Sequence, residues 1–213
     1  MTTELAAPAT TTRRLHAVSP DETVDVGIDR PGAIAAVEAL LAALGRDPGS
    51  THLAETPRRF TDAFIELLTP QPFAATTFAN DEHYDELVVV ADIPFNSLCE
   101  HHLLPFRGVA HVGYVPGDRL VGLSKLARVV ELFAHDLQVQ ERMTRQIADW
   151  IDETLEPLGV GVVLEAEHLC MSLRGVQAQG TRTTTSSLVG IVRDDDRTRR
   201  EFLGRCGLRG TGA

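Results

Sequence analysis

The chain has 213 residues, enough for one domain with a substantial core, and its 43% hydrophobic and 23% charged residues are ordinary for a globular protein. The formal net charge of −10 argues against nonspecific binding to nucleic acid or to an anionic membrane. The longest apolar runs, such as 87–91, are too short to span a bilayer, and residues 1–20 lack the apolar stretch of a signal peptide. We therefore expect a cytoplasmic protein whose partners include neither nucleic acid nor a membrane.

The N-terminal third of the sequence predicts a tail followed by two helices. Residues 1–28 are polar and without periodicity, which is typical of a disordered tail. From Pro31 onward, apolar residues share one helical face, and Gly45 is a plausible stop. These apolar residues are Ile34, Val37, Leu40, Leu41 and Leu44. A second helix is expected from Pro57 to Leu68 with Thr56 as its N-cap, and 69–83 is expected to be a loop, so 29–83 forms an N-terminal helical segment.

Residues 84–204 have a different character and predict the main domain. Strands are expected over 86–95, 106–115, 160–173 and 183–192, and helices over 138–155 and 197–203. A further helix begins at Ser124, which we expect to cap it. Strands that pair before two helices and then resume indicate an α+β fold, in which two helices pack on an antiparallel sheet. Residues 205–213 form a C-terminal tail.

Cysteines and histidines supply the first chemical signal. Cys99, Cys170 and Cys206 are too few and too scattered for a disulfide framework, so a metal or catalytic role comes first. Cys99 and His102 are three residues apart, and on one helical turn their side chains would point the same way. Thiolate and imidazole suit zinc, although C-x-x-H alone is a weak motif.

A second pair, His168 and Cys170, strengthens the metal interpretation. Both follow the alternating apolar positions of the strand predicted over 160–173, and they are expected on its core-facing side. A buried structural cysteine beside a core histidine explains them equally well when this pair is taken alone. Four ligands would close a structural site, whereas three would leave an open position for water, which is the catalytic arrangement. The spacing leaves both arrangements open.

Cations accompany these motifs. Lys125 is the only lysine among 20 basic residues, which reflects either a bias toward arginine or a need for a compact ammonium at this position. Ser124, Lys125 and Arg128 at a helix N-terminus indicate an anion site, although an ordinary cap with solvated charges explains them too. Arg174 adds a cation four residues after Cys170.

Long strings of the sequence resemble one family. They are LCEHHLLPFRGVAHVGYVPG, GLSKLARVVELFA, QVQERMTRQIA and EHLCMSLRGVQ. Together, and in this order, they resemble the zinc-dependent class of GTP cyclohydrolase I over residues 31–204. The resemblance implies a tunnelling fold (T-fold) whose sheets join into an oligomeric barrel, a homodecamer with active sites at subunit interfaces. It also implies the conversion of GTP to 7,8-dihydroneopterin triphosphate and formate by a zinc-activated water, the first step of pterin and tetrahydrofolate synthesis.

The resemblance also implies a role for each motif residue. Cys99, His102 and Cys170 match the zinc ligands, and His101 and His168 match the proton-transferring histidines. Gln140 and Glu141 match the pair that reads the guanine edge, and Gln140 is expected to take part in catalysis as well. Ser124 matches a catalytic residue near the ribose. The triphosphate contacts match Lys125, Arg128, Arg174 and Arg59, the last donated by an adjacent subunit.

One position departs from the family pattern. Some members carry a further lysine three residues after Arg59, where this chain has Asp62, so no cation is expected there. Two other functions compete with the resemblance. A non-catalytic zinc protein would use a closed cage of Cys99, His102, His168 and Cys170. A nicotinamide-dependent nitrile reductase of the same fold would use a nucleophilic cysteine, but it explains neither the metal motifs nor the basic cluster.

Overall fold

The structure, a computed structural model, describes residues 27–207. The predicted tail 1–28 therefore lies outside the described residues except for 27 and 28, as do 208–213 of the predicted C-terminal tail. The helices are α1 Arg30–Ala43, α2 Thr56–Leu68, α3 Leu123–Ala134, α4 Gln140–Leu155, α5 Leu169–Ser172, α6 Ile191–Asp194 and α7 Asp196–Arg205. The strands are β1 Thr77–Ala79, β2 Val88–Cys99, β3 Pro105–Val115, β4 Arg119–Val121, β5 Leu137–Gln138, β6 Gly159–His168 and β7 Thr183–Gly190.

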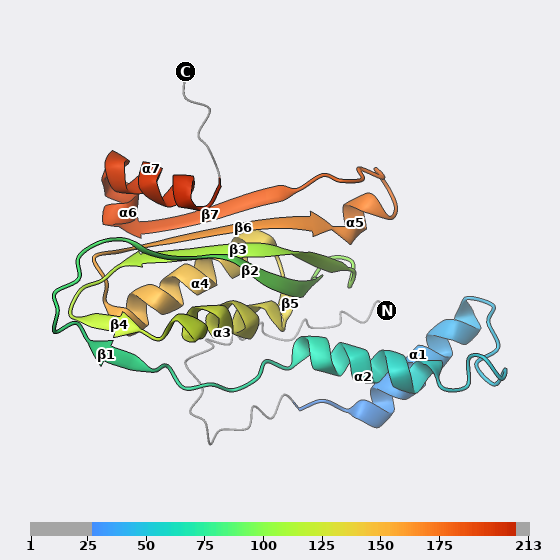
Figure 1. Cartoon of the computed structure of the whole chain (residues 1–213). Helices are drawn as coiled ribbons and strands as arrows, with labels where there is room; N and C mark the ends of the chain where they lie inside the picture. The colour runs from blue at the N-terminus through green and yellow to red at the C-terminus, as the bar shows by residue number, and fades with distance from the viewer. Residues whose placement is uncertain (1–26, 208–213) are drawn as a thin grey trace, which may run out of the picture.

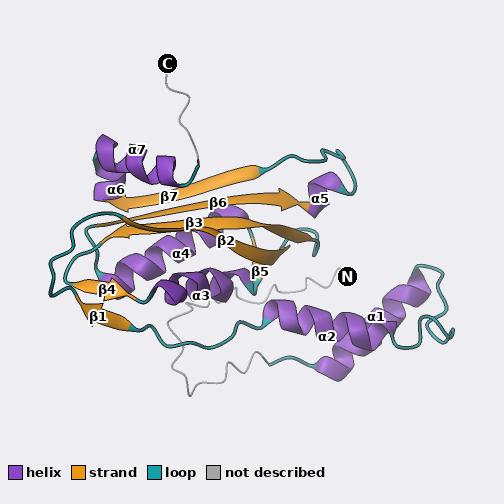
Figure 2. Cartoon of the chain, viewed as in Figure 1, coloured by secondary structure: helices purple, strands orange, loops and turns teal. Residues whose placement is uncertain are grey.

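A five-stranded sheet in the order β5-β2-β3-β6-β7 forms the centre of the molecule (Figure 1). Its pairs are antiparallel except for the short parallel pair of β2 with β5, and β1 pairs with β4 in a separate small sheet. Helices α3 and α4 pack on one face of the large sheet, and α6 and α7 cover part of the other (Figure 2). The fold is thus mixed α+β with antiparallel sheets, as the sequence predicts.

Apolar residues face both sides of the sheet, because alternate residues of a strand point to opposite sides. On β6, one set of alternate residues joins the large core beneath α3 and α4, namely Val160, Val162, Leu164 and Ala166. On the other side, Val163 joins a smaller core cluster with Phe202 of α7. A Cβ added to Gly161 would lie 2.6 Å from the Phe202 ring, so the absence of a side chain there lets α7 approach the sheet.

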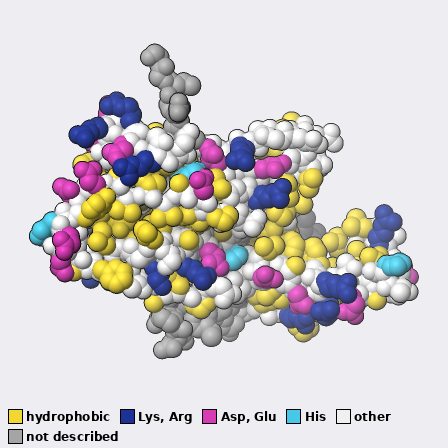
Figure 3. Space-filling view, in the orientation of Figure 1, with side chains coloured by type: hydrophobic (Ala, Val, Ile, Leu, Met, Phe, Trp, Pro, Cys, Tyr) yellow, Lys and Arg dark blue, Asp and Glu magenta, His cyan; other side chains and the backbone are white. Residues whose placement is uncertain are grey.

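The N-terminal helices stand apart from the sheet at one side of the molecule (Figure 1). Helix α1 has no buried residue, and Leu40 and Leu44 on its predicted apolar face are 52% and 66% exposed. The yellow apolar surface near these helices is visible in Figure 3. Asp62 of α2 accepts hydrogen bonds from Arg30 and Arg58, so it joins the two helices. This contact gives Asp62 a local role in joining α1 to α2.

Several predicted boundaries are wrong. Thr56 and Ser124 are not N-caps, because α2 and α3 each begin at or before these residues, with Glu55 and Gly122 as the caps. The expected loop at 69–83 contains β1, and residue 138 of the predicted helix 138–155 belongs to β5. The expected strand 160–173 ends at His168 and turns into α5, and the expected strand 183–192 ends at Gly190. None of the described helices is long and apolar enough to cross a membrane.

Candidate functional site

The first half of the candidate metal group is a turn at the end of β2. Cys99 is the last residue of the strand, and its carbonyl oxygen accepts hydrogen bonds from the amides of His102 and Leu103. This hydrogen-bonded turn, and not a helix, brings Cys99 Sγ and His102 Nδ1 to 3.8 Å. The expectation that the two side chains converge is met, although by a different local structure.

The second half comes from α5, which follows β6. Cys170 lies on this short helix, so its placement on the strand was wrong, yet its sulfur still reaches the turn after β2. The ligand atoms of Cys99, His102 and Cys170 all lie within 4.8 Å of one another, and the two cysteines are 6% and 9% exposed. Among the described residues, this is the only such group of three or more metal-binding side chains.

The chemistry and spacing of this group are compatible with zinc. Zn–S bonds of about 2.3 Å and Zn–N bonds of about 2.0–2.1 Å in a tetrahedron place neighbouring ligand atoms roughly 3.5–3.8 Å apart. The Cys99–His102 separation of 3.8 Å matches this spacing. Burial raises the pKa of the Cys170 thiol, as does the neighbouring Cys99, whereas the charge of Arg174 lowers it. A bound divalent cation would favour the thiolate and reverse the first two effects.

His168 is held beside the metal group without belonging to it. Its ring stacks on Phe106 with centroids 4.7 Å apart, and its Nε2 lies 2.7 Å from Gln140 Oε1. The Gln140 side-chain nitrogen donates to the carbonyl oxygens of Leu164 and Thr183 and to the hydroxyl of Thr185. These acceptors fix the orientation of the amide, so its oxygen faces His168 and accepts a hydrogen bond from Nε2–H. Burial lowers the pKa of His168, and the charge of Glu141 partly opposes this.

A cavity of about 240 Å³ unites these side chains. Its lining includes the whole Cys–His–Cys group together with His101, Gln140, Glu141 and His168. Glu141 is exposed in the first turn of α4, and its carboxylate makes no hydrogen bond or ion pair with any residue of 27–207. Arg145, which could have paired with it at helical spacing, binds Asp149 instead. The carboxylate is therefore available to a ligand.

Other predicted site residues lie outside this cavity. Ser124 and Lys125 begin α3, whereas the end of α3 leads into β5, which pairs with Cys99. Ten residues of helix separate Ser124 from that end, roughly 15 Å at 1.5 Å per residue. Figure 1 shows the start of α3 beside β4, at the far end of the sheet from α5. Arg128, one turn further along α3, is paired with Glu131.

The two remaining cations differ in their distance from the metal group. Arg174 lies in the segment after α5, close enough for its charge to act on Cys170. Arg59 lies on α2, outside the sheet, and makes no ion pair within 27–207. The structure thus unites seven predicted site residues in the cavity, brings Arg174 near it, and leaves Ser124, Lys125, Arg128 and Arg59 elsewhere on the same chain.

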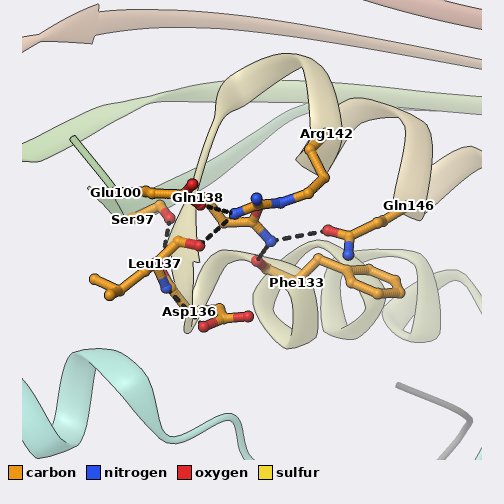
Figure 4. Close-up of polar contacts among 8 residues, drawn as sticks. All are labelled: Ser97, Glu100, Phe133, Asp136, Leu137, Gln138, Arg142 and Gln146. Atoms are coloured by element: carbon orange, nitrogen blue, oxygen red, sulfur yellow. Dashed lines mark hydrogen bonds and ion pairs between the residues drawn. The ribbon is translucent and has the colours of Figure 1, made fainter. Parts of the chain in front are cut away.

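Sequence reasoning missed a polar network beside the cavity, centred on Arg142 (Figure 4). Arg142 contacts Glu100, which lies between Cys99 of the candidate metal group and His101, and it also contacts Gln138. The signal was present in the regular spacing of Gln138, Arg142 and Gln146, four residues apart within an amphipathic segment.

The sequence matches known proteins over most of its length. The family model for GTP cyclohydrolase I matches residues 33–207. The chain belongs to the GTP cyclohydrolase I family. It is 50% identical over 180 residues to GTP cyclohydrolase 1 of Synechococcus sp. strain JA-2-3B'a(2-13), which covers 83% of this chain and 79% of the relative.

Other members of the GTP cyclohydrolase I family are similar to the same extent. The protein of that name from Mycobacteroides abscessus is 52% identical over 182 residues, covering 82% of this chain and 88% of the relative. The human protein is 44% identical over 191 residues, covering 86% of this chain and 75% of the relative. These matches include every segment that lines the cavity, so the Cys–His–Cys group and its histidines lie within the part of the chain that the family shares.

Proposed function

We propose that this chain hydrolyses and rearranges GTP to 7,8-dihydroneopterin triphosphate with release of formate, as the first step of pterin and tetrahydrofolate synthesis. The supporting observation is the cavity, which joins a zinc-compatible Cys–His–Cys group to two histidines and an unpaired carboxylate in a member of the GTP cyclohydrolase I family. Zinc held by Cys99, His102 and Cys170 would supply a Lewis acid and a water of lowered pKa at its open position.

The histidines of the cavity supply the proton transfers. Protonation of guanine N7 makes C8 electrophilic, and His168 or His101 is placed to donate that proton. His168 is suited to this role, because Phe106 and Gln140 restrict its ring and burial lowers its pKa, so that the protonated ring gives up its proton more readily. Opening of the imidazole ring and a second hydrolysis release formate, after which the ribose rearranges and closes the pterin.

Glu141 supplies the selection of the base. A carboxylate only accepts hydrogen bonds, and guanine offers it two adjacent donors, N1–H and the exocyclic amine. Its free carboxylate at the cavity is consistent with this role. Gln140 lies next to it, but its side-chain amide is already bonded to His168 and three internal acceptors, so its part in catalysis is to orient the His168 ring.

The cations that would bind the triphosphate support a shared site. Lys125 and Arg128 lie toward the far end of α3 from their own metal group, and Arg59 lies on α2, so the proposal places them at the sites of adjacent subunits. The exposed apolar face of α1 provides surface for such assembly. We include in the proposal the T-fold barrel and homodecamer that the resemblance implies. A cytoplasmic location is part of it too, because Cys99, Cys170 and Cys206 are all free thiols.

Incubation with GTP tests the proposed function. We expect a product that becomes a fluorescent pterin after oxidation, with formate released in equal amount. A chelator should abolish turnover, and added Zn²⁺ should restore it, with about one zinc bound per chain. Full turnover by a metal-free preparation would refute the zinc assignment, and a zinc-loaded preparation that leaves GTP intact would refute the reaction.

A further inference from the structure

Arg142 occupies an unfavourable position for a cation. It lies in the first turn of α4, where the helix dipole favours negative charge. Only one acidic residue, Glu141, shares that turn, and the N-cap Val139 provides no side-chain hydrogen bond. The position itself therefore does not favour the guanidinium, and its contacts come from elsewhere.

The compensating contacts come from two other segments (Figure 4). Arg142 Nη2 donates to the carbonyl oxygen of Leu137 at 2.6 Å and to the carboxylate of Glu100, and Nε donates to Gln138 Oε1 at 3.1 Å. Leu137 and Gln138 form β5, while Glu100 begins the turn that presents His101 and His102. One guanidinium thus links the start of α4, strand β5 and the metal-binding turn.

The acceptor on β5 is itself fixed in orientation. Gln138 is buried, and its side-chain nitrogen donates to the Phe133 carbonyl oxygen at 2.8 Å and to Gln146 Oε1 at 2.9 Å. Because both acceptors face the nitrogen, the amide cannot be reversed, and its oxygen must face Arg142. The backbone adds a further link, since the Glu100 amide donates to the Gln138 carbonyl oxygen at 3.0 Å.

We propose that Arg142 is a positioning residue that, through Glu100, holds the turn bearing His101 and His102 at a fixed distance from Gln140 and Glu141 on α4. In terms of the proposed function, on which this inference rests, the pair sets the separation between the metal group and the residues that bind the base. Arg142 does not line the cavity, and its hydrogen bonds run to Glu100, Leu137 and Gln138 and not to the Cys–His–Cys group.

The ion pair between Arg142 and Glu100 is not expected to act through folding stability. The side chains of Arg142 and Glu100 are 43% and 41% exposed, and exposed ion pairs contribute little to folding stability. Breaking this pair should therefore leave the fold intact while loosening the turn. Residues that orient metal ligands from outside the coordination sphere typically change metal affinity or activity about 10- to 100-fold when they are replaced.

Single and double substitutions test the proposal in the full-length protein. We would compare Arg142→Gln, Glu100→Ala and the double variant, with Arg145→Gln as the matched control, because Arg145 forms an exposed ion pair on the same helix away from the cavity. The readouts are kcat and KM for GTP, Zn²⁺ affinity by competition with a chelating dye, the absorption spectrum of the Co²⁺-substituted protein, and Tm.

The proposal predicts a specific pattern. Each single variant should lose about 10- to 100-fold in kcat with KM within about threefold, bind Zn²⁺ about tenfold more weakly and show an altered Co²⁺ spectrum. The double variant should be no worse than the poorer single variant, because both substitutions remove the same contact. Arg142→Lys should not rescue kcat, since an ammonium cannot reproduce the separate Nε and Nη2 contacts. Tm and the Arg145→Gln control should stay near wild type.

Three results would overturn the proposal. These are wild-type kcat and Zn²⁺ affinity in either folded single variant, losses that multiply in the double variant, and losses that merely follow a lower Tm. If Arg142→Gln does not fold, Glu100→Ala on the exposed turn decides alone. If the wild-type chain does not act on GTP, the proposed function fails, while Zn²⁺ affinity and the Co²⁺ spectrum still decide whether the pair positions the turn.

Discussion

Burial shifts the pKa values of two side chains, one at the cavity and one in the smaller core, in opposite directions. His168 lies half-buried at the cavity, where burial lowers its pKa and favours the neutral ring. Cys206 lies in the smaller core under α7, where burial raises the pKa of its thiol to about 12. Under the proposed function, the lowered pKa suits His168 to proton transfer, whereas the raised pKa keeps the Cys206 thiol protonated and unreactive. Substitution of His168 should therefore affect turnover, and substitution of Cys206 should not.

His168→Ala should retain about one zinc per chain and lose about 100- to 10,000-fold in kcat, the usual worth of a general acid–base step. The ring is hydrogen-bonded to Gln140 and is not part of the Cys–His–Cys group, so its removal leaves the ligands in place. Zinc content and turnover of GTP check this. A variant that no longer binds stoichiometric zinc would favour the closed four-ligand cage.

Glu141→Ala and Glu141→Gln should both weaken the use of GTP drastically while retaining zinc. The wild-type protein should not open the ring of ATP, because adenine presents a bare N1 and no 2-amino group to the carboxylate. Sites built around such polar partners reject analogues lacking them by about 10,000-fold or more. Steady-state kcat/KM with both nucleotides measures this. Comparable GTP turnover by Glu141→Ala would show that the base is read elsewhere.

Cys206 should make stability sensitive to alkaline pH. Its pKa rises from an ordinary 9.0 to about 12 on folding, so the folded state favours the protonated thiol. This contribution is complete below about pH 9 and is lost as the pH rises from there toward 12. In Cys206→Ala, the free energy of unfolding should fall less over that range, as urea titrations at several pH values would show. Zinc content and kcat should be unchanged; an equal alkaline loss in both proteins would contradict the assignment.

At the scale of elements, hydrophobic periodicity predicted most helices and strands, and local geometry explains the errors. Alternation along 160–173 reflects which side chains are buried, and α5 continues to bury Cys170 after the strand has ended, so the pattern does not mark the exit from the sheet. The helix prediction wrongly included Gln138 of the two-residue strand β5. Its buried side chain is hydrogen-bonded to Phe133 and Gln146, and a hydropathy pattern does not indicate such contacts.

Helix α7 should depend on one side chain for its place on the sheet. Phe202 is fully buried, and its ring lies over Gly113 and Gly161, where added Cβ atoms would lie 3.0 and 2.6 Å from it. Phe202→Ala should lower the free energy of unfolding by about 3–5 kcal/mol, measured by urea denaturation. Arg200→Ala, at an exposed position of the same helix, serves as the control and should change it by less than about 0.5 kcal/mol. A small effect of Phe202→Ala would mean that α7 is held by other contacts.

At the scale of the whole molecule, the sequence motifs predicted a set of site residues but not the distances between them. Cys99 and Cys170 are 71 positions apart along the chain and converge, because β2 and β6 both pair with β3 and end at the same edge. Lys125 is much closer to Cys99 in sequence, yet α3 carries it away from the metal group. Chain order alone could not distinguish these cases, since the distances depend on strand register and helix direction.

A mixture of two inactive variants should recover activity. If Arg59 acts at a neighbour's site, chains carrying Arg59→Ala and chains carrying His168→Ala can combine to give sites with both groups intact. Co-refolded mixtures should therefore show GTP turnover well above that of either variant alone, whereas each variant assayed separately supplies the baseline. No recovery in verified mixed oligomers would indicate that each chain builds its site from its own residues.

The placement of Lys125 and the Cys–His–Cys group toward opposite ends of α3 has a consequence for how output depends on chain concentration. Under the shared-site proposal, a single newly synthesised chain has a metal group but lacks the phosphate-binding cations of an adjacent subunit, so it does not act on GTP. Output would then rise more steeply than linearly with chain concentration until assembly is complete. Halving the supply of chains near that threshold would reduce product formation by more than half. A modest fall in expression would therefore cause a disproportionate loss of pterin.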